Sequence, residues 1–485
     1  KNINCKNLPS LRRNIVYQFL YELLIVFIPL FTIPYVSRVL GAENIGLFSY
    51  TYAVANYFVL FANLGIKNYG SRTIAMVRNN KEELNRNFSE ILSIHIIFSI
   101  IVIFVYLVLL FFFVEDNLVI FLIQSIYVFA AVFDINWFFF GIEKFKLTVG
   151  RNTLVKILSV FLVLVFVKTQ TDLWIYALIL ALSVFVGQSV VWFALKQYVS
   201  WRRPSWANMK QHIRPLFVLF LPILALSLYK YMDKIMLGSI SSNVQVGFYE
   251  NAEKIINVPM SLIMAFGVVL MPRIANMVTS KDKGEVFKLI DMSMEAVMLL
   301  AIAISFGLAG ISFVLAPIFF GYEFEECGIL IMGLAVTVPF MAFANVIRTQ
   351  YLIPYKEDKI FVVSLFLGAA VNLIVNIILI PYMAARGAVI GTIFAEIIVC
   401  IYQSYFVRKK IFIKKYLLNT IPPILIGIVM FVFVFQIGNV MNINIVTLIL
   451  QLLVGMFIYA VGVFLLMLKS RTRLMVLLRK FVVRY

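Results

Sequence analysis

Long apolar segments separated by short polar connections run along almost the whole chain. A helix crosses the hydrocarbon core of a membrane with roughly 20 predominantly apolar residues. The first six segments that reach this length are 15–38, 45–66, 91–114, 118–141, 147–167 and 173–195. Eight more follow at 215–237, 246–271, 296–319, 328–353, 360–380, 387–407, 416–436 and 443–468. The pattern predicts an all-α integral membrane protein with about fourteen transmembrane helices.

The uncharged stretches help to place the limits of these helices. Ile91–Val114 contains no Asp, Glu, Lys or Arg, and neither does Tyr416–Leu468. The second stretch is too long for one crossing, and Gln436, Gly438 and Asn439 near its middle suit a turn between two helices. The first apolar segment runs well beyond the short core of a signal peptide, so we expect it to be a span.

The basic residues are distributed unevenly between the two sides of the predicted helices. With the N-terminus placed inside, 36 of the 42 Lys and Arg residues fall in inside segments. Only Arg38, Lys168 and Arg386 fall in outside loops. Because an excess of Lys and Arg marks cytoplasmic loops, we expect both termini to be cytoplasmic.

The composition agrees with a membrane protein and excludes several other classes. Hydrophobic residues make up 63% of the chain and charged residues 13%, against about 45–50% and about 25% in soluble domains. The net charge of +19 would suit nucleic acid, but topology and anionic lipid account for basic residues in short cytoplasmic loops. The three Cys and two His residues are widely separated, so we expect no metal site and no cofactor.

Glycines at helix ends indicate an internal repeat. Gly41 follows the first span and Gly46 opens the next, while Gly238 and Gly247 take the same places at the seventh and eighth spans. The paired glycines are offset by 197 and 201 residues, and both odd helices leave from the same side. We therefore expect two parallel six-helix lobes around a central cavity, at 1–210 and 211–412, followed by two further helices in 413–485.

Short motifs at the helix ends occur in an order found in a known family. They are Pro34-Tyr-Val-Ser-Arg-Val-Leu-Gly41, Leu64-Gly-Ile-Lys-Asn-Tyr-Gly-Ser-Arg72, Asp134-Ile-Asn-Trp-Phe-Phe-Phe-Gly141, Asp233-Lys-Ile-Met-Leu-Gly238, Val246-Gly-Phe-Tyr249 and Gln350-Tyr-Leu-Ile-Pro354. In this set the chain resembles the Wzx-type polysaccharide flippases, a branch of the multidrug/oligosaccharidyl-lipid/polysaccharide exporter superfamily. The resemblance spans most of the first twelve predicted helices.

The resemblance implies a transporter rather than an enzyme. Its expected substrate is an undecaprenyl-diphosphate-linked oligosaccharide repeat unit, moved from the cytoplasmic to the outer leaflet of a bacterial plasma membrane by alternating access. The expected partners are membrane lipid and this substrate, whose product becomes O-antigen, capsule or another wall polymer. A polymerase partner stays open, and no nucleic acid is expected.

Ionisable residues inside the spans are candidates for the substrate site. Each costs about 2.5–3.5 kcal/mol to insert and usually faces a cavity or a partner. Lys230, Asp233 and Lys234 have the spacing that places them on one face of the seventh helix. Because a diphosphate needs cations at close range in a low-dielectric wall, we predict a cationic cavity. Its residues are Arg38, Lys230, Lys234, Lys254 and Arg348.

Structural roles are the alternatives for these cations. Asp233 can neutralise Lys230 or Lys234, which would leave no free charge for a substrate. Arg38 and Lys234 can extend to the outer interface instead of facing a cavity. Arg348, near the inner end of its span, can serve as a topology signal.

Acidic residues form a second group of candidates, for ion coupling or for lining the cavity. They are Glu22, Asp134, Asp233, Glu250 and Glu396. Asp134 either binds a coupling ion or has a structural role, in which it caps a kink or pairs with Lys156 or Arg151. His95 is expected to be a hydrogen-bonded packing residue.

Prolines predict bends in the repeat-related first and seventh helices. Pro34 and Pro222 each remove a backbone donor. Within a membrane this is tolerated where neighbouring helices or cavity water satisfy the freed carbonyl. We expect both helices to bend and the bending to contribute to gating.

Other functions fit the sequence less well. A polymerase or membrane glycosyltransferase would place catalytic residues on a large outward loop, whereas the longest such connection here lies around 239–250. A multidrug/cation antiporter of the same superfamily would bind hydrophobic cations, which lysines in the cavity repel. A major-facilitator sugar carrier would have an Asp in the loop between its second and third helices, which 63–72 lacks.

Overall fold

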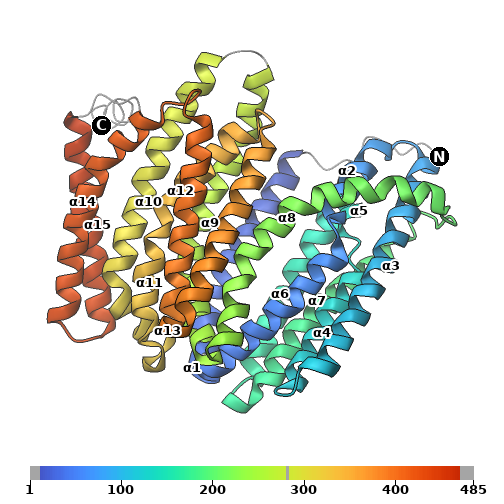
Figure 1. The fold of residues 1–485 in the computed structure, drawn as a ribbon, viewed down its shortest axis with the longest axis horizontal. Helices are drawn as coiled ribbons and strands as arrows, with labels where there is room; N and C mark the ends of the chain where they lie inside the picture. The colour runs from blue at the N-terminus through green and yellow to red at the C-terminus, as the bar shows by residue number, and fades with distance from the viewer. Residues whose placement is uncertain (1–10, 280–282, 470–485) are drawn as a thin grey trace. The chain divides into compact units, whose positions relative to one another are not determined.

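The computed structural model describes residues 11–279 and 283–469, and within these ranges the chain is helical and has no strand (Figure 1). The helices up to the middle of the chain are α1 (Leu11–Asn63), α2 (Ile66–Val77), α3 (Lys81–Phe113), α4 (Leu118–Val132), α5 (Asn136–Gly141), α6 (Phe145–Phe166), α7 (Leu173–Leu195) and α8 (Trp206–Ile240). Those that follow are α9 (Asn243–Thr279), α10 (Lys283–Phe320), α11 (Cys327–Ala335), α12 (Thr337–Ile347), α13 (Asp358–Val407), α14 (Ile413–Val440) and α15 (Ile445–Lys469). The predicted all-α membrane class is confirmed.

Eleven helices within the described ranges are long and apolar enough to cross a membrane. Two helices, α1 and α13, each contain two of the predicted spans. In α1 the helical conformation breaks at Gly41, with φ 76° and ψ 173°, and in α13 it breaks at Ala384, with φ 47° and ψ −126°. Glycine adopts such a positive φ readily, whereas an alanine does so only where its surroundings hold it there. The breaks separate the spans as expected, and the count of fourteen stays a prediction.

The chain divides into two compact units, residues 1–231 and 232–485, and the division falls within α8. Pro215 and Pro222 both lie inside this helix. Figure 1 shows α8 changing direction along its course within the first unit, in agreement with the bend expected from Pro222. That the bend contributes to gating stays a prediction.

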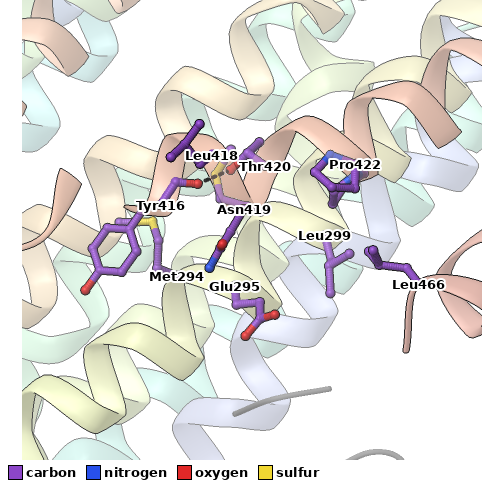
Figure 2. Close-up of a pocket in the computed structure, with 11 residues that line it drawn as sticks. Met294, Glu295, Leu299, Tyr416, Leu418, Asn419, Thr420, Pro422 and Leu466 are labelled. Carbon is purple, nitrogen blue, oxygen red and sulfur yellow. Dashed lines mark hydrogen bonds between the residues drawn. The ribbon is translucent and has the colours of Figure 1, made fainter. Parts of the chain in front are cut away.

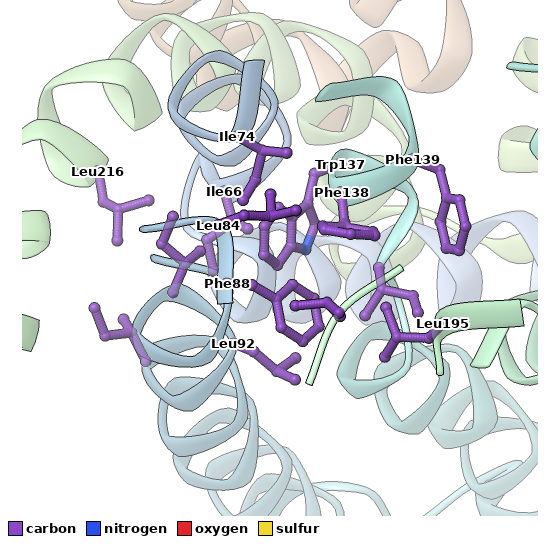
Figure 3. Close-up of a cluster of buried hydrophobic side chains, with 14 of the residues drawn as sticks. Ile66, Ile74, Leu84, Phe88, Leu92, Trp137, Phe138, Phe139, Leu195 and Leu216 are labelled. Atoms are coloured by element: carbon purple, nitrogen blue, oxygen red, sulfur yellow. The ribbon is translucent and has the colours of Figure 1, made fainter. Parts of the chain in front are cut away.

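The first unit has a core built from large side chains of α2, α3, α5, α7 and α8 (Figure 3). Trp137 on α5 stacks on Phe88 of α3 with ring centroids 5.5 Å apart, a contact worth about 0.5–1.5 kcal/mol beyond its buried area. Gly70 on α2 lies against the same indole, so close that a Cβ there would come within 2.5 Å of the ring. This close approach fixes α2 and α5 side by side.

The second unit holds α14 and α15 as a pair packed against α10. Met430 and Val434 of α14 form a buried cluster with Ile311 of α10. Val434 also faces Gly310 of α10, where a Cβ would come within 2.9 Å, and such small residues let helices approach closely in a membrane. Helix α14 ends at Val440 and α15 begins at Ile445, so two helices are present as predicted, but the turn lies at 441–444, and Gln436, Gly438 and Asn439 still belong to α14.

Candidate functional site

Buried charges gather in the second unit where the end of α8 meets the start of α9. Lys234 is 7% exposed, and its Nζ lies 2.5 Å from Glu250 Oε2 and 2.9 Å from Glu253 Oε2. Lys254 Nζ lies 3.1 Å from the other oxygen of Glu250. The two lysines and two glutamates therefore form one ion-pair network, called here the Lys234 network.

Local sequence explains why these side chains meet. Only Ser241 and Ser242 separate α8 from α9, so the end of one helix lies beside the start of the next. Glu250 and Lys254 are four residues apart on α9, a spacing that places them on one face with the acid toward the N-terminus. The network therefore forms from neighbouring turns of a helical hairpin.

Asp233 binds partners of a different kind. Its Oδ2 accepts hydrogen bonds from Tyr249 Oη at 2.6 Å and Thr392 Oγ1 at 2.9 Å. Its Oδ1 accepts one from Asn376 Nδ2 at 2.6 Å. The carboxylate is 3% exposed. All three donors are neutral, so Asp233 does not neutralise Lys230 or Lys234, and that alternative is wrong.

Helix α13 supplies two of these donors from either side of its break at Ala384. Asn376 lies before the break, where its amide also donates to Asn372 Oδ1 at 3.2 Å, and Thr392 lies after it. Gly391 packs so closely that a Cβ there would come within 2.2 Å of Asn376 Oδ1. The glycine is therefore required for this arrangement around Asp233.

The remaining predicted cations lie in different surroundings. Lys230 is exposed, and its Nζ lies 5.4 Å from the centre of the Tyr231 ring. Arg38 on α1 is exposed as well. Both belong to the first unit, so a cavity shared with Lys234 and Lys254 stays a prediction. Arg348 begins a short π-helix and donates to Asn345 Oδ1 at 2.5 Å.

The structure gives Asp134 a structural setting. Its Oδ1 accepts from the backbone and the amide of Asn136 at 3.0 and 2.7 Å, at the start of α5. Asn136 in turn accepts from Arg151 at 3.1 Å and donates to Gln188 at 2.9 Å. Asp134 therefore reaches Arg151 through an asparagine, and the capping role is the one these contacts favour.

Two other predicted acids are less informative. Glu396, on α13, is 8% exposed and has an interaction partner. Glu22 falls within α1, but its side chain lies outside the described residues. Their assignment as coupling or cavity residues stays a prediction.

The two histidines differ from what their isolation in sequence indicates. Both ring nitrogens of His95 are buried without a hydrogen-bond partner, so the prediction of a hydrogen-bonded residue is wrong. His212 instead has Glu90 and Tyr69 as partners, which come from helices far away in sequence. Among the described residues, no group of three or more His, Cys, Asp or Glu is arranged to hold a metal ion.

An apolar groove of about 950 Å³ runs between α10 and the pair α14–α15, with Pro259 of α9 at its wall. Its lining is almost entirely aliphatic or aromatic, including Leu300, Ile304, Met430, Leu452 and Phe464. No sequence pattern indicates this groove, since its residues have the same apolar character as those that face lipid.

A smaller pocket of about 90 Å³ adjoins the groove and shares Leu299 with it (Figure 2). Its wall is more polar and includes Glu295, Asn419 and Thr420. The neighbouring Tyr416 donates from its hydroxyl to Asp291 Oδ1 at 2.5 Å. The pocket therefore adds a polar wall beside the apolar groove.

Comparisons with known proteins agree with this picture. Residues 11–278 match the family described as polysaccharide biosynthesis protein. A protein assigned as an O-antigen transporter in Shigella dysenteriae is 24% identical, over 81% of this chain and 99% of the relative. The lipid II flippase MurJ of Bacillus subtilis is 28% identical, over 42% of this chain and 41% of the relative.

A solved structure shows the same fold. The lipid II flippase MurJ in an inward closed conformation superposes with a TM-score of 0.72 and 16% identity, over 93% of this chain and 98% of that chain. These relatives are transporters, which agrees with the prediction of a non-enzyme. The chain therefore belongs to the polysaccharide biosynthesis protein family, within the Wzx-type branch of the multidrug/oligosaccharidyl-lipid/polysaccharide exporter superfamily.

Proposed function

We propose that this protein flips undecaprenyl-diphosphate-linked oligosaccharide repeat units from the cytoplasmic to the outer leaflet of the bacterial plasma membrane by alternating access. The apolar groove beside α14 and α15 is the observation that carries the proposal. A volume of about 950 Å³ with an aliphatic wall accommodates a long hydrocarbon chain. The lipid chain passes into the groove from the bilayer, whose tails are as apolar as the groove wall, so it can enter without polar contacts and without leaving an apolar environment.

The Lys234 network supports recognition of the diphosphate. Phosphate oxygens are strong acceptors for lysine ammonium groups in a low-dielectric site. Lys234 is already neutralised by Glu250 and Glu253, whereas the Lys254 side chain is 32% exposed. We propose that the diphosphate meets Lys254 first and then competes with Glu250 for Lys234. This exchange of partners would link substrate binding to a change in how α8 and α9 are held together.

Asp233 supports ion coupling at a second centre. Its carboxylate is held by three neutral donors, so addition of a proton or a monovalent cation would change every one of those hydrogen bonds. The donors come from α9 and from both halves of α13. Loading of Asp233 would therefore be communicated to three helical segments of the second unit.

The substrate is tested in a strain that lacks the gene. Lipid-linked repeat units are followed leaflet by leaflet, with and without the gene restored. We expect intact units to accumulate on the cytoplasmic side and to clear on restoration. Normal arrival of the units at the outer leaflet, together with altered drug export, would favour the antiporter instead.

Asp233→Asn tests the coupling role. The amide is similar in shape but carries no charge, so we expect normal abundance and flipping reduced roughly tenfold or more, equivalent to about 1.4 kcal/mol of barrier. Exposed Glu285, paired with Lys288 on α10, offers Glu285→Gln as a matched control. Equal flipping by Asp233→Asn and the wild type would exclude Asp233 as the coupling acid.

A further inference from the structure

A buried polar triad joins three helices of the first unit. Glu90 on α3 and His212 on α8 have side chains 1% and 4% exposed, and Glu90 Oε2 lies 2.9 Å from His212 Nε2. The other ring nitrogen, Nδ1, lies 2.6 Å from the hydroxyl of Tyr69 on α2. The second oxygen of Glu90 is buried without a hydrogen-bond partner.

The triad lies beside the place where the connection between α7 and α8 is fastened to α3. Asn85 Oδ1 accepts from the backbone of Ser200 at 3.0 Å, and Ser89 Oγ accepts from that of Arg202 at 2.9 Å. His212 therefore continues a row of polar attachments between α3 and the segment that leads into α8. This row determines how firmly the first part of α8 is held to the first unit.

The geometry satisfies both protonation states of His212. In the neutral ring, Nε2–H donates to Glu90 and Nδ1 accepts from the Tyr69 hydroxyl. When Nδ1 takes up a proton, the Tyr69 hydroxyl rotates and accepts from Nδ1–H, while Nε2–H continues to donate to Glu90. No hydrogen bond is lost, so the site holds a proton without repacking of the helices.

Protonation of His212 also changes the charges of the site. With neutral His212, the Glu90 carboxylate is a buried charge whose partners in the described structure are neutral. Protonation of His212 converts it into a buried ion pair, which removes the cost of an isolated charge. The titratable groups in contact are Glu90 from α3, His212 from α8 and Tyr69 from α2. The charged neighbours along these helices are exposed: Lys67, Arg72, Arg86, Lys210 and Arg214.

We infer that Glu90, His212 and Tyr69 form a proton-binding site that strengthens the attachment of α8 to α2 and α3 when it is occupied. The proton resides on Nδ1 of His212, which faces the Tyr69 hydroxyl, while Nε2 of the same ring faces Glu90. In transport, which rests on the proposed function, occupancy of this site would set how easily α8 changes its bend at Pro215 and Pro222. The site is separate from Asp233, which belongs to the other unit.

Nitrogen-15 NMR of histidine-labelled protein in nanodiscs tests the inference directly, because the chain contains only two histidines. We expect His212 to be an Nε2–H tautomer at high pH and to carry a second proton, on Nδ1, when the pH is lowered. His95, whose ring nitrogens have no partner, supplies the second histidine signal. His95→Gln assigns the two signals. A His212 that keeps one neutral tautomer throughout would overturn the inference.

Two variants separate a proton site from a packing contact. In Glu90→Gln we expect His212 to stay neutral when the pH is lowered, since the compensating charge is gone. In Tyr69→Phe, which serves if Glu90→Gln fails to fold, we expect a mixture of neutral tautomers because Nδ1 has lost its donor. Titration of His212 unchanged in both variants would contradict the inference. None of these NMR measurements depends on flipping. Failure of the flippase assay can therefore be distinguished from absence of the proton site.

Discussion

The two units bury charge in different ways. In the first, the Glu90 carboxylate contacts His212, and His212 contacts Tyr69. The histidine can change its protonation state, and the tyrosine hydroxyl can either donate or accept. In the second, Lys234 is surrounded by two carboxylates, and Asp233 is held by neutral donors alone. Separating a lysine from two carboxylates that surround it costs much free energy. A histidine whose partners can switch between donor and acceptor can gain or lose a proton at a small free-energy cost. The second unit therefore holds a centre with fixed ion pairs, and the first unit a centre suited to proton binding.

The largest effect is expected from Lys234→Met. Removal of the ammonium leaves Glu250 and Glu253, whose side chains are 13% and 24% exposed, without their main compensating charge. Loss of one partner from a buried pair costs about 3–5 kcal/mol, so we expect a marked fall in melting temperature in detergent. Lys288→Met is the matched control, because Lys288 and Glu285 are about half exposed and such a pair is worth about 0–1 kcal/mol. Similar melting temperatures for both variants would contradict the expected difference between the Lys234 network and the exposed Lys288–Glu285 pair.

A smaller effect is expected at the core of the first unit. Gly70→Ala would place a Cβ within 2.5 Å of the Trp137 ring, and overpacking of this kind costs about 1–3 kcal/mol. Gly150→Ala on α6 is the control, since nothing lies within 4 Å of its added Cβ. There the alanine should stabilise the helix by up to about 1 kcal/mol. Thermal unfolding of both variants measures the difference, and destabilisation by Gly150→Ala alone would invert the expected order.

Thr392→Val sharpens the account of Asp233. The substitution keeps the shape but removes one of three donors to a buried carboxylate, a loss of about 1–3 kcal/mol. We expect a modest fall in melting temperature together with weaker flipping. Thr337→Val is the control, because Thr337 lines neither pocket and its hydroxyl donates to the nearby carbonyl of Leu334, at 2.6 Å. Flipping reduced equally by both variants would argue against a special role for Thr392.

The smallest effect on stability is expected in the groove. Ala303→Trp fills part of its volume without entering a packed core, so we expect little change in melting temperature. Flipping should fall roughly tenfold, equivalent to about 1.4 kcal/mol of barrier, if the lipid chain must enter there. The control is Val429→Trp on the exposed side of α14, where Val429 is 48% exposed. Unimpaired flipping by Ala303→Trp would remove the groove from the mechanism.

Much of the fold could be predicted from the sequence because apolar length alone determines where a helix can cross a membrane. The turn before α15 and the breaks near Gly41 and Ala384 follow from the same pattern. The Lys234 network could also be predicted in part, since Lys234 lies near the end of one helix and Glu250 and Lys254 lie near the start of the next.

The rest could not be predicted because it depends on contacts between distant segments. Asn376 and Thr392 are 143 and 159 residues from Asp233, and Glu90 is 122 residues from His212. No local pattern links such residues, so the sequence pairs Asp233 only with its neighbouring lysines and leaves His212 isolated. The groove could not be predicted for a different reason: the sequence does not distinguish leucines that face a cavity from leucines that face lipid.

Flipping by the purified protein in liposomes tests the central claim most directly. Fluorescent undecaprenyl-diphosphate-linked oligosaccharide is incorporated in both leaflets, and an impermeant quencher is added outside. We expect wild-type protein to move the inner-leaflet fluorescent lipid outward, where the quencher reaches it. In protein-free vesicles the inner-leaflet lipid should stay protected. Protection that persists with folded wild-type protein, with and without an imposed ion gradient, would contradict the account.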